Sequence, residues 1–336
     1  MKILVTGDFH LTDNAKEEYR WNVFNLLKEY SCHDSLVILG DLTERKGKHS
    51  SYLVNRLVDS ITSLRSTFDN VYILEGNHDF EKGDNKPFFD FLNCFGCIKF
   101  ISIDCLKINS IHSVFVPYRN THKFESFIDS NVSNVFMHTD VIGGMYESGN
   151  QLDKGINPTV FDKYDNVRFI SGHIHTPQRI GKNFTYVGSP HQVDFSDNFS
   201  PRFLSIGNES IQNIPINDHI SRYNLVINDL DDLRAICIKK GDHVKITYEL
   251  HLSDINRWFN IKTEILNHFK RLGAIVFSVV PSVQKVKNVL IDEKSNKNKD
   301  VSDPIIVKRF GLKNKLSREQ IEEGLNLVTI NQSKGD

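Results

Sequence analysis

Residues 3–10 read ILVTGDFH, a short apolar run that ends in a glycine followed by an aspartate and a histidine. Runs this short, rich in valine and isoleucine and apolar on both faces, are typical of buried strands in a sheet. The same unit recurs along the chain and ends each time in a side chain that can bind a metal: LVILGD at 36–41, VYILEGNHD at 71–79, VFMH at 135–138 and VRFISGHIH at 167–175. This repeated strand end organises the first half of the protein.

The segments between the early strand-like runs carry apolar residues at helical spacing. These residues are Trp21, Phe24 and Leu27 in one segment and Leu53, Leu57, Ile61 and Leu64 in the next. Strands that alternate with helices predict βαβ units, and closely spaced strand-like runs over 97–116 and 186–214 add antiparallel pairing. We therefore expect residues 1–214 to form an α/β domain, a layered sandwich of mixed sheets flanked by helices.

A smaller unit is expected after a polar stretch near residues 215–222. Residues 222–291 combine a strand over 243–250, an amphipathic helix over about 253–272 that Gly273 would end, and a strand over 274–281. This order predicts a small α+β domain.

The last part of the chain changes character. Residues 292–303 are almost wholly polar and read as a flexible linker. Residues 304–336 contain a capping box formed by Ser317 and Gln320. We expect this terminal segment either to pack as a helix or to dock on a partner protein.

Composition excludes several classes of protein. Of the 336 residues, 39% are hydrophobic and 25% are charged, which is ordinary for a globular protein and argues against a disordered or fibrous one. Lys and Arg number 41 against 42 Asp and Glu, so any attraction for phosphate must be local. No apolar run approaches the roughly 18 residues of a membrane span, and the five cysteines lack disulfide spacing. A cytoplasmic location is expected.

The strand ends supply a set of metal-competent side chains. Because the carboxyl ends of parallel strands meet at one edge of a sheet, residues far apart in sequence would converge there. The set is Asp8, His10, Asp41, Asn77, His138, His173 and His175. Carboxylate, amide and imidazole ligands suit divalent Mn, Fe or Zn, and seven candidates exceed what one ion needs. Two ions about 3.5–4 Å apart that share a bridging carboxylate would use them all.

This ordered set of motifs resembles the calcineurin-like metallophosphoesterase superfamily. The resemblance implies a four-layer sandwich in which Asp8, His10, Asp41 and His175 hold one metal, Asp41 bridges, and Asn77, His138 and His173 complete the second site. It also implies that His78 is the catalytic histidine that contacts the phosphate and that Asp79 orients it. The chain departs from the family at Glu44, three residues after Asp41, where His or Asp is common.

Within the superfamily, the sequence is most similar to SbcD-type nuclease subunits of double-strand-break repair complexes, including the recombination endonuclease subunits of large phages. The resemblance implies two Mn²⁺ ions, with Mg²⁺ as the other option. It also implies exonuclease activity on duplex DNA ends, endonuclease activity on single strands, a homodimer, and an SbcC-like coiled-coil ATPase as partner. Residues 222–291 would then be a DNA-capping domain, and 304–336 the segment that docks on the ATPase.

One local feature supports DNA as the substrate. Residues 281–318 contain ten Lys or Arg against four acidic residues, a charge excess that could follow a phosphate backbone. A solvated linker or a surface for an acidic partner accounts for it equally well. Two other functions remain open: a metallophosphoesterase that hydrolyses small nucleotide phosphodiesters, and a non-catalytic scaffold that binds an ATPase.

Overall fold

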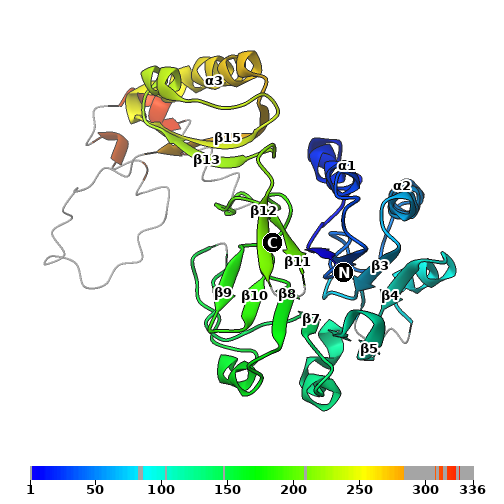
Figure 1. Ribbon diagram of the computed structural model, residues 1–336. Coiled ribbons are helices and arrows are strands. Elements are labelled where there is room, and N and C mark those ends of the chain that lie inside the picture. The colour runs from blue at the N-terminus through cyan, green and yellow to red at the C-terminus, as the bar shows by residue number, and fades with distance from the viewer. Residues whose placement is uncertain are drawn as a thin grey trace, which may run out of the picture. The chain divides into compact units, whose positions relative to one another are not determined.

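The computed structural model describes residues 2–283 apart from 82–85, 103, 147, 208 and 209, together with residues 307, 310–312, 316–322 and 325. Its first sheet (Figure 1) has the order β12-β11-β1-β2-β3-β4. The strands are β1 (Ile3–Thr6), β2 (Ser35–Ile38), β3 (Asn70–Leu74), β4 (Ile98–Ile101), β11 (Arg202–Ile206) and β12 (Ile211–Pro215). Strands β1 to β4 pair in parallel, and β11 pairs antiparallel with both β1 and β12.

The second sheet has the order β5-β6-β7-β8-β10-β9. Its strands are β5 (Leu106–Ile108), β6 (Ser113–Val116), β7 (Asn134–His138), β8 (Arg168–Gly172), β9 (Gln178–Ile180) and β10 (Phe184–Tyr186). Strands β6, β7, β8 and β10 run parallel, and β5 and β9 are antiparallel edges. The predicted mixture of parallel and antiparallel pairing is confirmed in both sheets.

Three apolar cores separate the layers. The core between the two sheets packs Val5 and Val37 of the first against Phe115, Phe136 and Ile170 of the second. A second core lies between the first sheet and the helices α1 (Val23–Lys28) and α2 (Ser51–Ser63), which lie together on one side of it (Figure 1). A third core covers the outer face of the second sheet. The expected sandwich of mixed sheets flanked by helices is therefore confirmed.

Much of the connecting chain is 3₁₀ rather than α-helical. The expected helix around Trp21 is a 3₁₀ segment, Ala15–Asn22, that runs into α1. Other 3₁₀ segments are Leu64–Ser66, Phe88–Cys94, Asn109–Ile111, Tyr118–Phe127, Pro158–Lys163, Leu230–Ala235 and Leu252–Arg257. Within the described residues, no helix combines the length and apolar character needed to cross a membrane.

A third sheet follows the sandwich. Its strands are β13 (Arg222–Ile227), β14 (His243–Leu250) and β15 (Ile275–Val283), all parallel, and α3 (Trp258–Leu272) packs on one face through Ile261, Ile265 and Phe269. The α-helix begins later than expected, because the first turns after Leu252 are 3₁₀. Gly273 ends it at φ +74°, a left-handed conformation that glycine adopts without steric cost.

The chain divides into two compact units, Met1–Gln284 and Lys285–Asp336. The expected linker over 292–303 lies outside the described residues, as do most residues of the expected docking segment. Within the second unit, the Ser317 Oγ accepts a 3.2 Å hydrogen bond from the Gln320 backbone N–H, and the Gln320 side chain accepts a 2.9 Å bond from the Ser317 N–H. The predicted capping box is confirmed.

Candidate metal centre

The metal-competent side chains all follow the carboxyl ends of strands in the two sheets. Asp8 and His10 follow β1, Asp41 follows β2, Asn77 follows β3, His138 ends β7, and His173 and His175 follow β8. Because these strands are parallel neighbours within their sheets, their ends meet at one edge of the sandwich. The structure brings most of these residues together there in two clusters; Asp8 belongs to neither, and its Oδ1 lies 4.0 Å from the His138 Nδ1.

The first cluster contains Asp41, Asn77, His138 and His173. The Asn77 Oδ1 lies 2.7 Å from the His138 Nε2 and 2.9 Å from the His173 Nδ1. The Asp41 Oδ2 lies 3.5 Å from the same His138 nitrogen. Ligand atoms of Asp41, His138 and His173 all lie within 4.8 Å of one another, which is close enough for one ion to contact all three.

The second cluster contains His10, Asp41 and His78, whose ligand atoms also lie within 4.8 Å of one another, with His175 beside them. The His10 Nε2 lies 3.6 Å from the Asp41 Oδ2 and 3.1 Å from the His175 Nε2. Asp41 thus belongs to both clusters. A carboxylate placed between two groups of ligands is the arrangement that a bridging ligand requires.

Two observations show that the residues suit a cation. The Asp8 carboxylate is fully buried; its Oδ1 accepts a 2.9 Å bond from the His173 backbone N–H, but its Oδ2 has no hydrogen-bond partner among the described residues. A buried carboxylate oxygen left in this way is costly unless a cation or donor satisfies it. The His10 and His175 rings also point their Nε2 atoms at each other. Two unprotonated ring nitrogens placed in this way can both bind one ion.

The backbone is strained at the same residues. Asp8, His10, Asp41 and His173 have φ values of +56°, +46°, +53° and +87°, and they are four of the five non-glycine residues with positive φ in the described part of the chain. A left-handed conformation costs such residues about 1–2 kcal/mol each and persists only where the surroundings impose it. The strain is therefore concentrated on the candidate ligands.

Gly40 and Gly76 allow the strand ends to come close together. Gly40 has φ +88°, and a Cβ there would lie 2.7 Å from Gly76 backbone atoms and 2.7 Å from the His138 Nδ1. A Cβ on Gly76 would lie 2.2 Å from the Asp41 Oδ1. Side chains at either position would occupy the space that the ligands need.

His78 and Asp79 take different partners from those expected. The His78 Nδ1 lies 2.7 Å from the Glu44 carbonyl oxygen, so this backbone group orients the ring. The Asp79 carboxylate instead accepts hydrogen bonds from the backbone N–H groups of Asp41, Leu42 and Gly76 at 2.8, 3.0 and 2.9 Å. The expectation that Asp79 orients His78 is therefore corrected: Asp79 holds the backbone on which Asp41 stands.

Each charged group in the centre shifts the pKa of its neighbours. Burial alone would raise the pKa of Asp41, but the adjacent His138, His10 and His78 outweigh it and hold that pKa well below its usual range. Burial would lower the pKa of His138, yet the Asp41 carboxylate raises it to about 9. Burial and the charge on Asp41 raise the pKa of Asp79 to about 7, although backbone N–H groups oppose them. Negative charge is thus concentrated on the shared ligand, Asp41.

Two further carboxylates contact the candidate ligands. The Asp140 Oδ1 lies 2.9 Å from the His173 Nε2, so it fixes the ring that offers Nδ1 to the first cluster. Asp140 is not among the site residues predicted from the sequence, although its carboxylate stands only two residues after the strand-end His138. The Glu44 Oε2 lies 3.3 Å from the His10 Nδ1. Burial would raise the pKa of Glu44, but the neighbouring His10 and Arg20 outweigh it and lower that pKa to about 2.

A buried ionic chain connects this centre with the third sheet. The Arg20 guanidinium donates to the His10 carbonyl oxygen and, at 2.9 Å, to the Glu17 Oε1. The same Glu17 oxygen lies 3.2 Å from the Nη1 of Arg222, the first residue of β13. The side chains of Arg20 and Arg222 are 3% and 5% exposed. Glu17 therefore pairs with both arginines away from water.

His191 lies behind the centre rather than in it. Its ring is buried, and its Nε2 lies 2.9 Å from the Phe9 carbonyl oxygen, while the Ser189 Oγ donates a 2.9 Å bond to the Asp8 carbonyl. Both side chains support the backbone between Asp8 and His10. Neither is among the groups that could hold an ion.

Comparison with known proteins gives one family, one protein of known sequence and two solved structures. The model of the family described as calcineurin-like phosphoesterase matches residues 1–177. A protein of Invertebrate iridescent virus 6 that carries the name phosphoesterase 244L is 29% identical over 264 residues, which cover 72% of this chain and 86% of the viral protein. Among solved structures, an archaeal phosphodiesterase has a TM-score of 0.34 at 12% identity, covering 64% of this chain and 100% of its own. The Pseudomonas putida nuclease MPE has a TM-score of 0.31 at 14% identity, covering 64% and 87%.

Proposed function

The chain belongs to the calcineurin-like phosphoesterase family, whose members are metal-dependent hydrolases, and we propose that this one is a DNA nuclease that uses two Mn²⁺ ions. It acts as an exonuclease on duplex ends and an endonuclease on single strands. The proposal further assigns it to a recombination and repair complex, as a homodimer that binds an SbcC-like coiled-coil ATPase through residues 304–336.

The observation that carries the proposal is the pair of ligand clusters that share Asp41. In each cluster the ligand atoms of three side chains lie within 4.8 Å of one another, and His78 belongs to one of these clusters. Bound divalent cations would polarise a phosphodiester and activate the attacking water. Phosphodiester hydrolysis is the reaction that this combination of ligands and histidine supports best.

His78 is suited to act on the leaving oxygen. The Glu44 carbonyl can only accept a hydrogen bond, so the proton on the His78 ring nitrogen beside it is Nδ1–H. The Nε2 atom is then left for the substrate. With both ring nitrogens protonated, it would donate a hydrogen bond or proton to the oxygen on which charge develops. The Asp41 Oδ1 accepts a 2.8 Å bond from the His78 backbone N–H, so the histidine is placed by the shared ligand itself.

The choice of DNA rests on sequence features outside the ligand clusters. Residues 281–318 carry ten basic against four acidic residues, and most of them lie outside the described part of the chain. The three-stranded domain that begins at Arg222 exceeds what a phosphoesterase for small substrates needs. The ordered strand-end motifs point to SbcD-type nucleases, from which the ATPase partner and the dimer are inferred.

The test is nuclease activity of the purified full chain. End-labelled duplex DNA, circular single-stranded DNA and bis-p-nitrophenyl phosphate are each incubated with Mn²⁺, with Mg²⁺ and with a chelator. The variants are His78→Ala and Asp41→Ala, and the matched control is His122→Ala, which removes an exposed histidine. We expect Mn²⁺-dependent cleavage of both DNA substrates that falls at least a thousandfold in the first two variants and not in the control.

Other outcomes would overturn the proposal. Hydrolysis of the small diester with no cleavage of either DNA, even when an SbcC-like ATPase is added, would make the protein a phosphodiesterase for small nucleotides. DNA cleavage that persists in Asp41→Ala would show that the shared carboxylate is not essential.

A further inference from the structure

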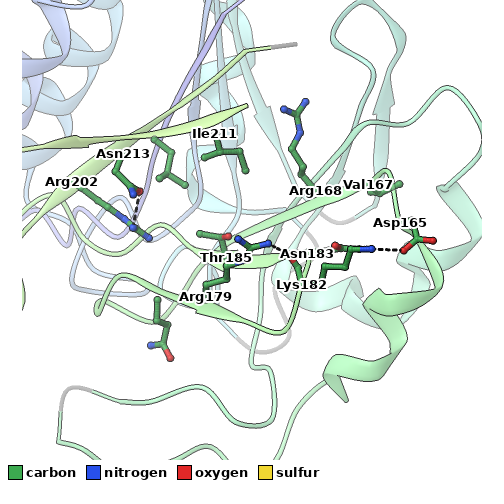
Figure 2. Close-up of a pocket in the computed structure, with 12 residues that line it drawn as sticks. Asp165, Val167, Arg168, Arg179, Lys182, Asn183, Thr185, Arg202, Ile211 and Asn213 are labelled. Atoms are coloured by element: carbon green, nitrogen blue, oxygen red, sulfur yellow. Dashed lines mark hydrogen bonds and ion pairs between the residues drawn. The ribbon is translucent and has the colours of Figure 1, made fainter. Parts of the chain in front are cut away.

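A basic cavity lies away from the metal centre. It has a volume of about 470 Å³ and is lined by residues of the segment just before β8, of β8 to β12 and of the turns between them (Figure 2). Four cationic side chains line it, Arg168, Arg179, Lys182 and Arg202, against one carboxylate, Asp165. Lys182 pairs with Asp165 at 2.8 Å, so the three arginines carry the excess positive charge.

The three arginines have no carboxylate partner among the described residues. Arg168 donates a 2.9 Å bond to the Gly207 carbonyl oxygen, and Arg179 donates to the Lys182 carbonyl. Arg202 donates to the carbonyl oxygens of Val187 and Tyr186 at 3.2 and 2.9 Å and to the Asn213 Oδ1 at 2.8 Å. These bonds hold the side chains in place, but within the described part of the chain no carboxylate offsets their charges.

Burial makes the uncompensated charges costly. Arg168 and Arg202 are half-buried, and burial lowers the pKa of both guanidinium groups. A half-buried arginine without a counter-ion gains free energy when an anion arrives, because the anion replaces the lost hydration. The cavity is therefore built to attract negative charge.

The remaining lining sets the size and character of the ligand. Thr185, Asn183 and Asn213 offer neutral hydrogen-bonding groups, and the buried Leu204 and Val167 add apolar surface. The volume falls within the roughly 300–1,000 Å³ of small-molecule sites. Arginine forks match the oxygens of phosphate groups, which they bind through two parallel hydrogen bonds.

The cavity is separate from the candidate metal centre. Arg168 is the first residue of β8, and Gly172 is the last, with His173 following it. At about 3.3 Å per residue, the two ends of this strand are about 13 Å apart. A ligand held by Arg168 would thus sit at the opposite end of the strand from the ions.

We propose that this cavity binds a phosphate group carried by a nucleotide-sized molecule or by a nucleic-acid strand. The site is independent of the proposed nuclease activity, because it uses none of the metal-centre residues. It gives the enzyme a second point of contact with phosphate.

The test is calorimetric titration of the full chain, kept metal-free with a chelator so that the metal centre cannot hold the ligand through ions. The probes are inorganic pyrophosphate, ADP and a short single-stranded DNA. Arg179→Gln is the principal variant, because this exposed side chain can be changed without removing support from the core. Arg202→Gln is the second variant, and Arg234→Gln, which changes an exposed arginine elsewhere, is the matched control.

We expect at least one probe to bind, with an affinity that falls as salt is added and drops about tenfold in Arg179→Gln and Arg202→Gln but not in Arg234→Gln. Binding of pyrophosphate or ADP assigns the site to a small ligand, and binding of the DNA alone assigns it to a nucleic-acid strand. No binding of any probe, or equal binding by the wild type and both pocket variants, would overturn the proposal.

Discussion

The Asp79 carboxylate accepts a 2.8 Å hydrogen bond from the backbone N–H of Asp41, the residue common to both ligand clusters. The same carboxylate also bonds Leu42 and Gly76, so one buried side chain joins the ends of β2 and β3. Asp79→Asn would turn an amide NH₂ group towards one of these donors. We expect a loss of about 2 kcal/mol in the free energy of unfolding and weaker binding of Mn²⁺.

Chemical denaturation and calorimetric metal titration measure the two effects of Asp79→Asn. The control is Asp153→Asn, an exposed aspartate outside the centre. Unchanged metal affinity in Asp79→Asn would show that this carboxylate does not position Asp41.

Gly40→Ala tests the close approach of the strand ends. Gly40 and Gly149 both have positive φ, +88° and +81°, but a Cβ on Gly149 would meet nothing within 4 Å. Gly149→Ala should therefore cost only about 1 kcal/mol, the strain of a left-handed alanine. Gly40→Ala adds a clash with Gly76 and should lower stability by at least about 3 kcal/mol. Equal unfolding midpoints in urea for the two variants would contradict the steric explanation.

Glu17→Gln tests the buried ionic chain. The change leaves Arg222 without its carboxylate in a side chain that is 5% exposed, so we expect a loss of about 3 kcal/mol in stability. Proteolysis in the segment that precedes β13 should also become faster, because Glu17 links this strand to the first domain. Glu18→Gln is the matched control. The pair of Glu18 with Arg56 lies at the surface, with the Glu18 side chain 62% exposed, so this change should lower the free energy of unfolding by less than about 1 kcal/mol. Thermal unfolding that ranks the two variants in the opposite order would refute this role for Glu17.

His243 makes the free energy of unfolding depend on pH. Burial, followed by the positive charges of Arg222, Arg20 and Lys16, lowers its pKa to about 4, from an ordinary 6.5. The unfolded chain binds a proton below pH 6.5 while the folded protein does not, so stability falls from about pH 6.5 to pH 4 and this residue adds no further loss below that. After allowance for solvent screening, the loss at pH 5 is about 1 kcal/mol.

His243→Gln should remove that part of the acid dependence. Urea denaturation at pH 7 and pH 5 measures it, with His251→Gln, an exposed histidine, as the control. A difference between the two pH values that is the same in His243→Gln and the wild type would exclude His243 as its source.

The parts of the fold that sequence predicts well are those with local signals. Strand β14 occupies the expected residues 243–250, because alternating apolar side chains and a flanking glycine mark it. Gly273 ends α3 as expected, since its φ is one that glycine favours. The start of α3 was misplaced because the residues before Trp258 lack a side-chain cap, so nothing local distinguishes a 3₁₀ turn from the first turn of an α-helix.

In the candidate site, too, the residues with local sequence signals can be predicted and the others cannot. The candidate ligands are visible in sequence because each lies within three residues of a glycine that follows or ends a strand-like run, or, for His138, at the strand end itself. The role of Asp79 is not, because its partners are backbone groups, two of them 37 and 38 residues away. The pairing of Glu17 with Arg222 spans 205 residues and carries no motif. Contacts of this kind depend on the folded chain and leave no pattern in the sequence.

The left-handed backbone at Asp8, His10, Asp41 and His173 restricts which residues can replace these ligands. Aspartate, asparagine and histidine tolerate that conformation better than other side chains do, and between them they offer the oxygen and imidazole ligands that divalent metal ions bind. Glutamate and cysteine satisfy the second requirement for some metals but not the first. Attempts to retune metal preference by exchanging ligands therefore have few usable residue types at these four positions. The choice is wider at the other three candidate ligands, Asn77, His138 and His175, whose φ is not positive, and at the carboxylates that contact the ligands, Asp140 and Glu44.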